Sequence, residues 1–355
     1  ALEDQYPVGT DSARFMRQAK MIVEKGGLPS VDTQRWHPIG RATREQLTLT
    51  ADVIAGLYKV VHRFYPRITV EKIALFYPVI ISVLSGPIFF LLIRRLLGTS
   101  VALLSLNLFF IMHPVAYRTA AGFAEQDALC LLLAFSTYYF YVCGYQATSL
   151  RHRYVYMSLS GVLMGLLGLT WHGVTLMLAP IVCVEWVKYL IKNEASDFKL
   201  YLCWASPILM AFIGFKTVYH HLTEGYALAA LILLCLPILI RSIHLSLESI
   251  PSIRVSNWFE NRYRVSFVLT GFASFSLGGM VLWILRSTHT ISQASLLESF
   301  LAPFGPSRLF RTVEELATHS WETWRIWPGV FFFLFIIGSL LCLRRLATSL
   351  SLNFW

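Results

Sequence analysis

The chain has 355 residues, of which 56% are hydrophobic and 14% charged, and its mean hydropathy is +0.58. A soluble domain is about 45–50% apolar and about 25% charged, so these values exclude an ordinary soluble protein and indicate an integral membrane protein. We assign the formal net charge of +10 to cytoplasmic loops and to contacts with anionic lipid or pyrophosphate, not to nucleic acid. None of the six cysteines has C-x-x-C spacing, which argues against a zinc site or a disulfide framework.

Residues 1–50 are polar and rich in turn signals, and because the chain opens there without a Met, we expect a preceding span or signal anchor to be missing. Residues 51–66 predict a short interfacial helix that ends at Pro66. Beyond it, runs of about 20 apolar residues predict roughly nine membrane spans. The spans centre near 73–93, 101–117, 128–147, 154–170, 173–191, 200–215, 226–240, 266–285 and 326–343. Aromatic runs such as "STYYFYV" are typical of interfacial belts and lipid-facing spans, and a groove for a polyprenyl chain is the alternative.

The predicted organisation is therefore an all-α, polytopic membrane protein. It comprises a first external loop with the interfacial helix (1–66), transmembrane helices (67–285), a long external loop (286–325) and a last visible transmembrane helix (326–355). Basic residues fall on alternate connections, and the positive-inside rule assigns those connections to the cytoplasmic side. The opposite, external side then holds residues 1–50, the 118–127 turn, the 171–173 break and the 286–325 loop.

Acidic residues that are far apart in the sequence collect on this external side: Asp11, the pair Glu125 and Asp127, and Glu315. Carboxylates are the ligands that Mg²⁺ and Mn²⁺ prefer, and such ions often bring a phosphate with them. Simpler interpretations remain open for each acid. Asp11 fits a helix N-cap, Glu125 and Asp127 fit a solvated turn, and Glu315 fits a loop acid beside Glu314.

Four short motifs follow one another on the external side. Asp11 opens "DSARFM", the segment "LPSVDTQRWHPIGR" contains a Pro-x-Gly-Arg turn, "YRTAAGFAEQDAL" carries Arg118 before Glu125 and Asp127, and "TVEE" carries Glu315. In this order, along nearly the whole chain, they resemble the catalytic subunit family of oligosaccharyltransferase, the enzyme of N-linked protein glycosylation. The acidic pair is the E-x-D form of that family's second motif.

The resemblance implies a GT-C-type transmembrane helix bundle with large external loops. It implies a metal-dependent glycosyltransferase that moves a glycan from a polyprenyl or dolichyl (pyro)phosphate to the side-chain amide of an Asn-x-Ser/Thr acceptor. The implied cofactor is Mn²⁺ or Mg²⁺. The implied partners are a lipid-linked oligosaccharide, an acceptor polypeptide, membrane lipid and other subunits of a glycosylation complex. The expected location is the prokaryotic plasma membrane or the endoplasmic reticulum, with the active site on the external or lumenal face.

The resemblance also implies roles for individual residues. The catalytic carboxylates would be Asp11 and Glu315, and the metal ligands Asp11, Glu125, Asp127 and Glu315. The implied substrate-binding residues are Arg118, Thr312, His172, Arg308 and Arg311. For Arg118 a snorkelling arginine at a span end is the alternative, and for His172 an interfacial histidine.

The sequence departs from the family in one respect. The family's soluble C-terminal domain, with its Trp-Trp-Asp motif, and the last membrane spans have no counterpart here. We therefore expect either a truncated chain or a membrane-only relative with another acceptor. Other polyprenyl-phosphate-sugar glycosyltransferases with O-linked or lipid acceptors remain an alternative, which the "TVEE" motif disfavours. A transporter is a further alternative, which the position of the acids at span ends and the lack of an internal repeat disfavour.

Overall fold

The computed structural model describes residues 9–35, 37–43, 46–171, 173–187 and 198–214, with a few positions between 234 and 242. This part is mostly α-helical, as predicted. Its helices are α1 (Thr10–Lys25), α2 (Leu49–Phe64), α3 (Val70–Leu97), α4 (Thr99–Ile111), α5 (His113–Arg118), α6 (Asp127–Gln146), α7 (Leu150–Gly168), α8 (Val174–Val187) and α9 (Phe198–Gly214). Two short strands, β1 (Val31–Asp32) and β2 (Arg41–Ala42), pair antiparallel in a small hairpin between α1 and α2.

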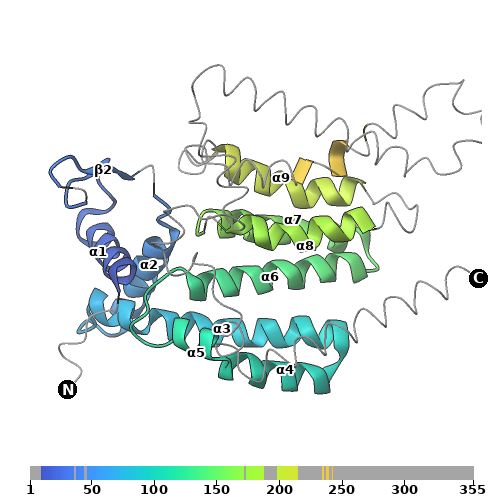
Figure 1. The fold of residues 1–355 in the computed structure, drawn as a ribbon, viewed down its shortest axis with the longest axis horizontal. Helices are drawn as coiled ribbons and strands as arrows, with labels where there is room; N and C mark the ends of the chain where they lie inside the picture. Colours follow the sequence, from blue (N-terminus) through green and yellow to red (C-terminus); the bar gives the residue numbers. More distant parts are fainter. Residues whose placement is uncertain are drawn as a thin grey trace, which may run out of the picture.

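The longer helices lie side by side in a bundle (Figure 1). α6 packs against α3 and α7, α7 packs against α9, and α4 lies along α3. α1, α2 and the hairpin lie together at one end of this bundle (Figure 1). Lys20 of α1 forms an ion pair of 2.9 Å with Glu71 in the first turn of α3, which ties this end group to the start of α3.

Most of the predicted spans within the described residues correspond to helices. α3 and α6 are long and apolar enough to cross a membrane, and α4, α8 and α9 are shorter apolar helices. The predicted interfacial helix corresponds to α2, which ends two residues before Pro66. The predicted spans 226–240, 266–285 and 326–343 lie largely or wholly outside the described residues. A multi-span topology with the hairpin end outside stays a prediction.

The segment of the predicted span 101–117 is not a single continuous helix in the structure. α4 ends at Ile111, and the shorter α5 begins at His113, with Met112 in a non-helical conformation between them. The cause is Pro114, in the first turn of α5, because a proline ring disfavours helical conformation before it and lacks an N–H to continue the ladder. The break frees α5 to turn toward the end of the bundle where α1 lies.

Tyrosines of α6 hold α8 in place. The Tyr138 hydroxyl donates to the Met177 carbonyl at 2.8 Å, and Tyr141 donates to Glu185 Oε1 at 2.6 Å. Tyr145 donates to the same Glu185 oxygen. Glu185 is fully buried, and a buried carboxylate is costly unless it is hydrogen-bonded. Within "STYYFYV", these positions therefore pack inward, in contrast to the expected lipid-facing belt.

Glycines of α7 let α9 approach closely. A Cβ on Gly161 would lie 2.1 Å from the Trp204 carbonyl oxygen, and one on Gly165 would lie 2.9 Å from the Ala211 Cβ. Trp204 is fully buried at this contact. Small residues at such interfaces let the backbones of two membrane helices approach closely. The resulting van der Waals contacts stabilise the pair, because the hydrophobic effect does not drive helix association within lipid.

We expect Gly161→Ala to destabilise the protein, because the clash is with backbone that cannot move as a side-chain tip does. Overpacking of this kind costs about 1–3 kcal/mol. The check is the thermal unfolding midpoint of the purified protein in detergent. Gly56→Ala is the matched control, because nothing lies within 4 Å of a Cβ on that exposed α2 glycine. It should keep or slightly raise the midpoint. Equal midpoints for the two variants would contradict the prediction.

Candidate functional site

One arginine holds the two acids that precede and open α6. Arg118, the last residue of α5, lies 3.0 Å from Glu125 and 3.3 Å from Asp127, both measured from its Nη1 atom. Asp127 is in the first turn of α6, where a negative charge also complements the helix dipole. All three side chains are partly buried, at 18–34% exposed. Both acids are therefore paired with a neighbouring arginine, so their interpretation as acids of a solvated turn is wrong.

Backbone contacts fix the position of this turn. The Gly122 N–H donates to the Leu75 carbonyl of α3 at 2.9 Å, and the Glu125 N–H donates to the Phe123 carbonyl at 2.8 Å. Gly122 has a φ of 101°, a conformation that favours glycine. The turn is thereby attached to α3, and Glu125 is held at the end of the bundle.

The start of α1 lies against Glu125. A Cβ on Gly9 would be 3.3 Å from Glu125 Oε1, and the φ of Gly9 is 91°. Gly9, not Asp11, is the N-cap residue of α1, so the N-cap interpretation of Asp11 is wrong. Asp11 lies in the first helical turn, half-exposed, with its Oδ1 atom 3.4 Å from Arg14 Nη1. Residues from α1 and from the turn before α6 thus meet at one place.

Arginines surround Asp11. Burial lowers the pKa of Arg14, and the nearby charges of Arg35 and Arg41 lower it further. The carboxylates of Asp11 and Glu125 oppose this shift. Burial also lowers the pKa of Arg35, with Arg41 adding to the shift and Asp11 opposing it. An arginine nevertheless stays charged in proteins. Arg14 therefore lies within electrostatic range of an acid on α1 and an acid before α6, with two further cations from the hairpin nearby.

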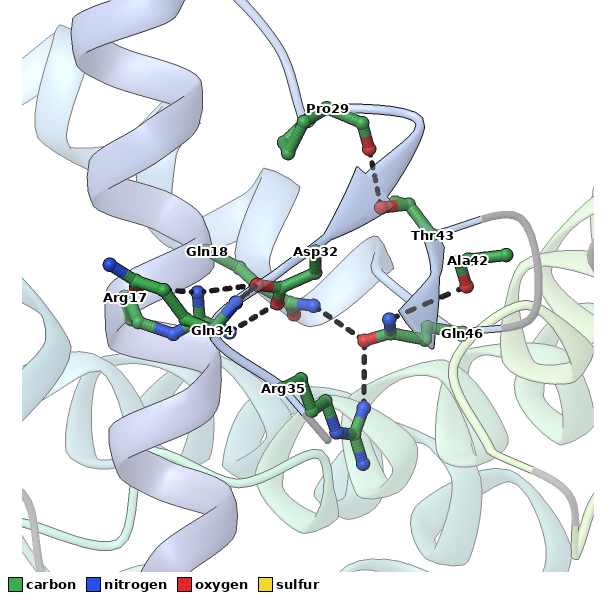
Figure 2. Close-up of polar contacts among 9 residues, drawn as sticks. All are labelled: Arg17, Gln18, Pro29, Asp32, Gln34, Arg35, Ala42, Thr43 and Gln46. Atoms are coloured by element: carbon green, nitrogen blue, oxygen red, sulfur yellow. Dashed lines mark hydrogen bonds and ion pairs between the residues drawn. The ribbon is translucent and has the colours of Figure 1, made fainter. Parts of the chain in front are cut away.

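The hairpin is fixed to α1 by side-chain hydrogen bonds (Figure 2). Arg17 of α1 contacts both carboxylate oxygens of Asp32 and donates to the Gln34 amide oxygen at 3.1 Å. The Asp32 side chain is only 4% exposed, and the Arg17 hydrogen bond lowers its pKa, with burial opposing the shift. A bidentate arginine–carboxylate pair of this kind is among the stronger polar contacts in proteins.

A second contact lies beside the first. Gln18, the next residue of α1, donates to the Gln46 amide oxygen at 2.9 Å, and Arg35 donates to the same oxygen at 2.7 Å (Figure 2). Because Arg14, Arg17 and Gln18 are spaced three and four residues apart, they share one face of α1. The face of α1 that contacts the hairpin therefore also bears Arg14, which pairs with Asp11.

Several predicted site residues lie outside the described residues: His172, Arg308, Arg311, Thr312 and Glu315. Within the described part of the chain, no three His, Cys, Asp or Glu side chains gather closely enough to hold a metal ion. The structure does bring Asp11, Arg118, Glu125 and Asp127 to one end of the bundle. Their catalytic and metal-binding roles stay predictions.

Sequence reasoning missed the arginines around Asp11. Arg14 was detectable, because an acid and an arginine at i and i+3 of a helix form a pair. Arg35 carried no such signal. It lies near Asp11 only because the hairpin folds back on α1, and nothing in a polar loop sequence fixes that path.

The fold and the candidate site together define the class of this protein. It is a helical protein with helices long and apolar enough to cross a membrane, and charged side chains from distant segments gather at one end of its bundle. Residues 6–314 match the family described as "Oligosaccharyl transferase STT3, N-terminal". The match covers most of the chain, and the chain therefore belongs to this family of membrane proteins. No curated protein sequence matches it.

Solved structures share the fold at low sequence identity. One is the archaeal oligosaccharyltransferase AglB from Archaeoglobus fulgidus in complex with an inhibitory peptide and a dolichol-phosphate, at 16% identity and a TM-score of 0.70 over 96% of this chain and 41% of that chain. Another is an Archaeoglobus fulgidus oligosaccharyltransferase tethered to an acceptor peptide with the NVT sequon, at 15% identity and a TM-score of 0.61 over 79% of this chain and 35% of that chain. A third, with Zn and sulfate, has 15% identity and a TM-score of 0.58 over 84% and 38% of the two chains. The chain thus spans about two fifths of the first of these proteins.

We expect Asp32→Asn to loosen the hairpin at neutral pH, because Arg17 then loses its charged partner, at a cost of about 1–3 kcal/mol. Since Arg17 lowers the pKa of Asp32 in the folded protein, the pair stabilises the fold above the ordinary carboxyl pKa. This contribution is lost as the pH falls through the lowered pKa. Hydrogen–deuterium exchange of residues 30–43 should be faster in the variant at neutral pH, and the difference should shrink in acid. Asp52→Asn, at an exposed aspartate of α2, is the control, and equal exchange in Asp32→Asn and wild type at neutral pH would contradict the prediction.

We expect Arg118→Gln to loosen the turn before α6, because Glu125 and Asp127 would then lack the cation that lies between them. The measurement is hydrogen–deuterium exchange of residues 119–126, where protection should fall about tenfold or more, in line with the loss of a charge-assisted hydrogen bond. Arg95→Gln is the matched control, because Arg95 donates to Gln146 at the other end of α6 at 2.6 Å. An effect of equal size on the 119–126 turn in both variants would contradict this role for Arg118.

Proposed function

We propose that this chain is the membrane part of an oligosaccharyltransferase catalytic subunit. It would transfer a glycan from a polyprenyl or dolichyl (pyro)phosphate to the side-chain amide of an Asn-x-Ser/Thr acceptor. The single observation that carries the proposal is the family match over residues 6–314. The gathering of Asp11, Arg118, Glu125 and Asp127 at one end of the bundle supports it. The dolichol-phosphate and the NVT acceptor peptide bound to similar structures also support it.

The acceptor nitrogen sets the chemical problem. An amide nitrogen is a poor nucleophile because its lone pair is delocalised into the carbonyl, and the same delocalisation gives a rotation barrier of roughly 18–20 kcal/mol. Two carboxylates that accept the two N–H groups of the asparagine amide would favour a twisted, more nucleophilic geometry. Asp11 suits one of these roles, because it is half-exposed at the first turn of α1. The proposal assigns the second role to Glu315.

The leaving group sets the other requirement. A departing (pyro)phosphate gains negative charge, and fixed cations stabilise that charge most where water is excluded. Arg118 is well placed for this role, because it lies at the start of α6 and is partly buried. Asp11 and Arg35 both act on the pKa of Arg14, so Arg14 and Arg35 add positive charge to the same end of the bundle.

The acids that the structure describes at this end do not by themselves gather closely enough to hold a metal ion, so the proposal adds Glu315 from the 286–325 loop. Asp11, Glu125 and Asp127 offer carboxylates, the ligand type that Mg²⁺ and Mn²⁺ prefer. The proposal assigns Asp11, Glu125, Asp127 and Glu315 to hold the ion. When bound, the ion would supply charge neutralisation at the leaving phosphate. One similar structure contains Zn and sulfate, which supports a divalent cation without distinguishing Mn²⁺ from Mg²⁺.

The proposal includes the membrane orientation and the predicted regions. Residues 1–66 would form the external loop that carries Asp11, residues 67–285 the spans, and residues 286–325 the external loop that carries Glu315, before a last span at 326–355. The active site would face the outside of the cell or the lumen. The membrane character of the family and the length and apolarity of α3 and α6 support insertion in a membrane, and the basic residues on alternate connections support the orientation.

The test is transfer of a lipid-linked oligosaccharide to a fluorescent Asn-x-Thr peptide by the full-length protein, with Mn²⁺ or with EDTA. We expect glycopeptide only with the metal, and a loss of about 100-fold or more in Asp11→Ala and in Glu315→Ala, the usual scale for removing a group that stabilises the transition state.

Asp52→Ala is the control, because Asp52 is an exposed acid on α2 away from these motifs, and it should keep full activity. Donor binding by each variant separates a catalytic loss from a binding loss. A folded protein that binds the donor but makes no glycopeptide would contradict the N-linked reaction and favour an O-linked or lipid acceptor.

A further inference from the structure

The C-terminal end of α2 exposes apolar and basic side chains together. Phe64 is 82% exposed, Val60 is 60% exposed and Tyr65 is 55% exposed. Lys59, Arg63 and Arg67 are exposed beside them. We call these six residues the α2 tip. An isolated exposed apolar residue needs no explanation, but a large aromatic group left almost fully in solvent beside two other apolar groups indicates a contact surface.

The α2 tip is not a by-product of poor packing. The other side of α2 packs into the protein, with Ala51, Ile54 and Ala55 almost fully buried. Val60 and Phe64 lie four residues apart, as do Lys59 and Arg63, and Gly56 precedes Val60 by the same spacing. All of them are exposed. Lys59, Val60, Arg63 and Phe64 therefore form one continuous stripe of the helix surface, opposite the packed face, and Tyr65 and Arg67 follow directly after the helix end.

The path of the chain brings the α2 tip close to the membrane. α3, a candidate membrane span, begins at Val70, five residues after Tyr65. Five extended residues reach at most about 18 Å, and here the Ile68 N–H bonds back to the Tyr65 carbonyl at 3.1 Å, which shortens the path. The side chain of Thr69 caps α3 by accepting from the Lys72 N–H at 3.3 Å. Tyr65, at the end of the tip, therefore lies within about 18 Å of the start of α3.

Its chemistry matches that layer. Aromatic residues concentrate at the membrane interface. Lys and Arg side chains close to a surface that contains anionic lipid are attracted to its headgroups. Lys59, Arg63 and Arg67 precede α3 and the exposed Lys72 lies in its first turn, so four basic residues flank the start of this helix. We propose that the α2 tip docks on the membrane surface, with Phe64 and Tyr65 at the interface and the basic residues on anionic lipid headgroups.

This docking has a consequence for the candidate site. α2 packs against α1 and α3, and α1 carries Asp11 and the residues that hold the hairpin. Lipid contact at the C-terminal end of α2 would therefore brace the helix against which α1, the helix that carries Asp11, packs. The inference requires only that α3 crosses the membrane, so it stands or falls independently of the proposed reaction.

The test uses the full-length protein in nanodiscs made from phosphatidylcholine alone or from phosphatidylcholine with phosphatidylglycerol. A photo-crosslinking benzoylphenylalanine replaces Phe64, and in a matched protein it replaces Asp52, which is exposed three turns earlier on the same helix. Adducts are identified by mass spectrometry. We expect lipid adducts at position 64 that increase at least about threefold with the anionic lipid, and few at position 52.

Charge variants separate the two parts of the contact. Lys59→Gln with Arg63→Gln and Arg67→Gln should remove the dependence on phosphatidylglycerol, whereas Lys25→Gln, at an exposed lysine that ends α1, should not. Hydrogen–deuterium exchange of residues 56–65 in the unaltered protein gives a second readout, with stronger protection in the anionic nanodisc. The proposal is overturned if position 64 crosslinks to protein, if it forms no adduct, or if adducts and exchange are the same in both lipids.

Discussion

A carboxylate is costly to bury without a partner, and this constraint organises the described part of the chain. Arg118 lies between Glu125 and Asp127 at the point where α6 begins. The bond from Gly122 to Leu75 attaches the same turn to α3. Since the start of α1 abuts Glu125 at Gly9, the arginine and its two acids anchor the junction of three helices. The position of Asp11 depends on this junction.

A second carboxylate shows the same constraint with a different outcome. Glu185 is fully buried in α8 and accepts hydrogen bonds from two tyrosines of α6. Its contacts join two helices within the bundle, far along α6 from Asp127. Acids at the end of the bundle are instead partly exposed and paired with arginines. Burial and partner type therefore distinguish Glu185, a fully buried acid held by tyrosines, from the partly exposed acids at the end of the bundle, which pair with arginines.

The sequence predicted much of this fold because the strongest signal, a run of apolar residues of spanning length, survives folding unchanged. α3 and α6 correspond to such runs. The signal failed at His113-Pro114, where hydropathy continues but the helix does not, since hydropathy does not register a missing N–H. The hairpin strands have only two residues each, too few for any alternation of apolar and polar positions to be visible.

The candidate site was predictable to a smaller extent. Glu125 and Asp127 were predicted because acids at the edge of an apolar span are costly without a role. Asp11 was predicted because the expected topology places it on the same external side. The arginine cluster was not, because Arg35 reaches Asp11 only through the contacts of the folded loop: Arg17 with Asp32, and Gln18 with Gln46. Such long-range polar contacts depend on the path of the whole loop and have no local pattern.

The charges at this end of the bundle indicate what kind of ligand it favours. Asp11, Glu125 and Asp127 bring three negative charges, and Arg14 and Arg118 pair with them directly. Arg35 and Arg41 lie close enough to act on the same group, so cations already outnumber these acids. A divalent ion would increase this excess of positive charge. An anionic ligand would neutralise part of the excess, whereas a neutral ligand would not.

Glu125 faces two different elements with its two carboxylate oxygens. Its Oε2 atom contacts Arg118 on α5, whereas its Oε1 atom faces Gly9 at the start of α1. The carboxylate thus presents its two oxygens to two elements that the sequence separates widely. A ligand held at Glu125 is sensitive to the position of both elements. The hydrogen bonds that fix the hairpin to α1, from Arg17 to Asp32 and from Gln18 to Gln46, lie farther along that helix. They help to set both the orientation of α1 and the position of Arg35 near Asp11.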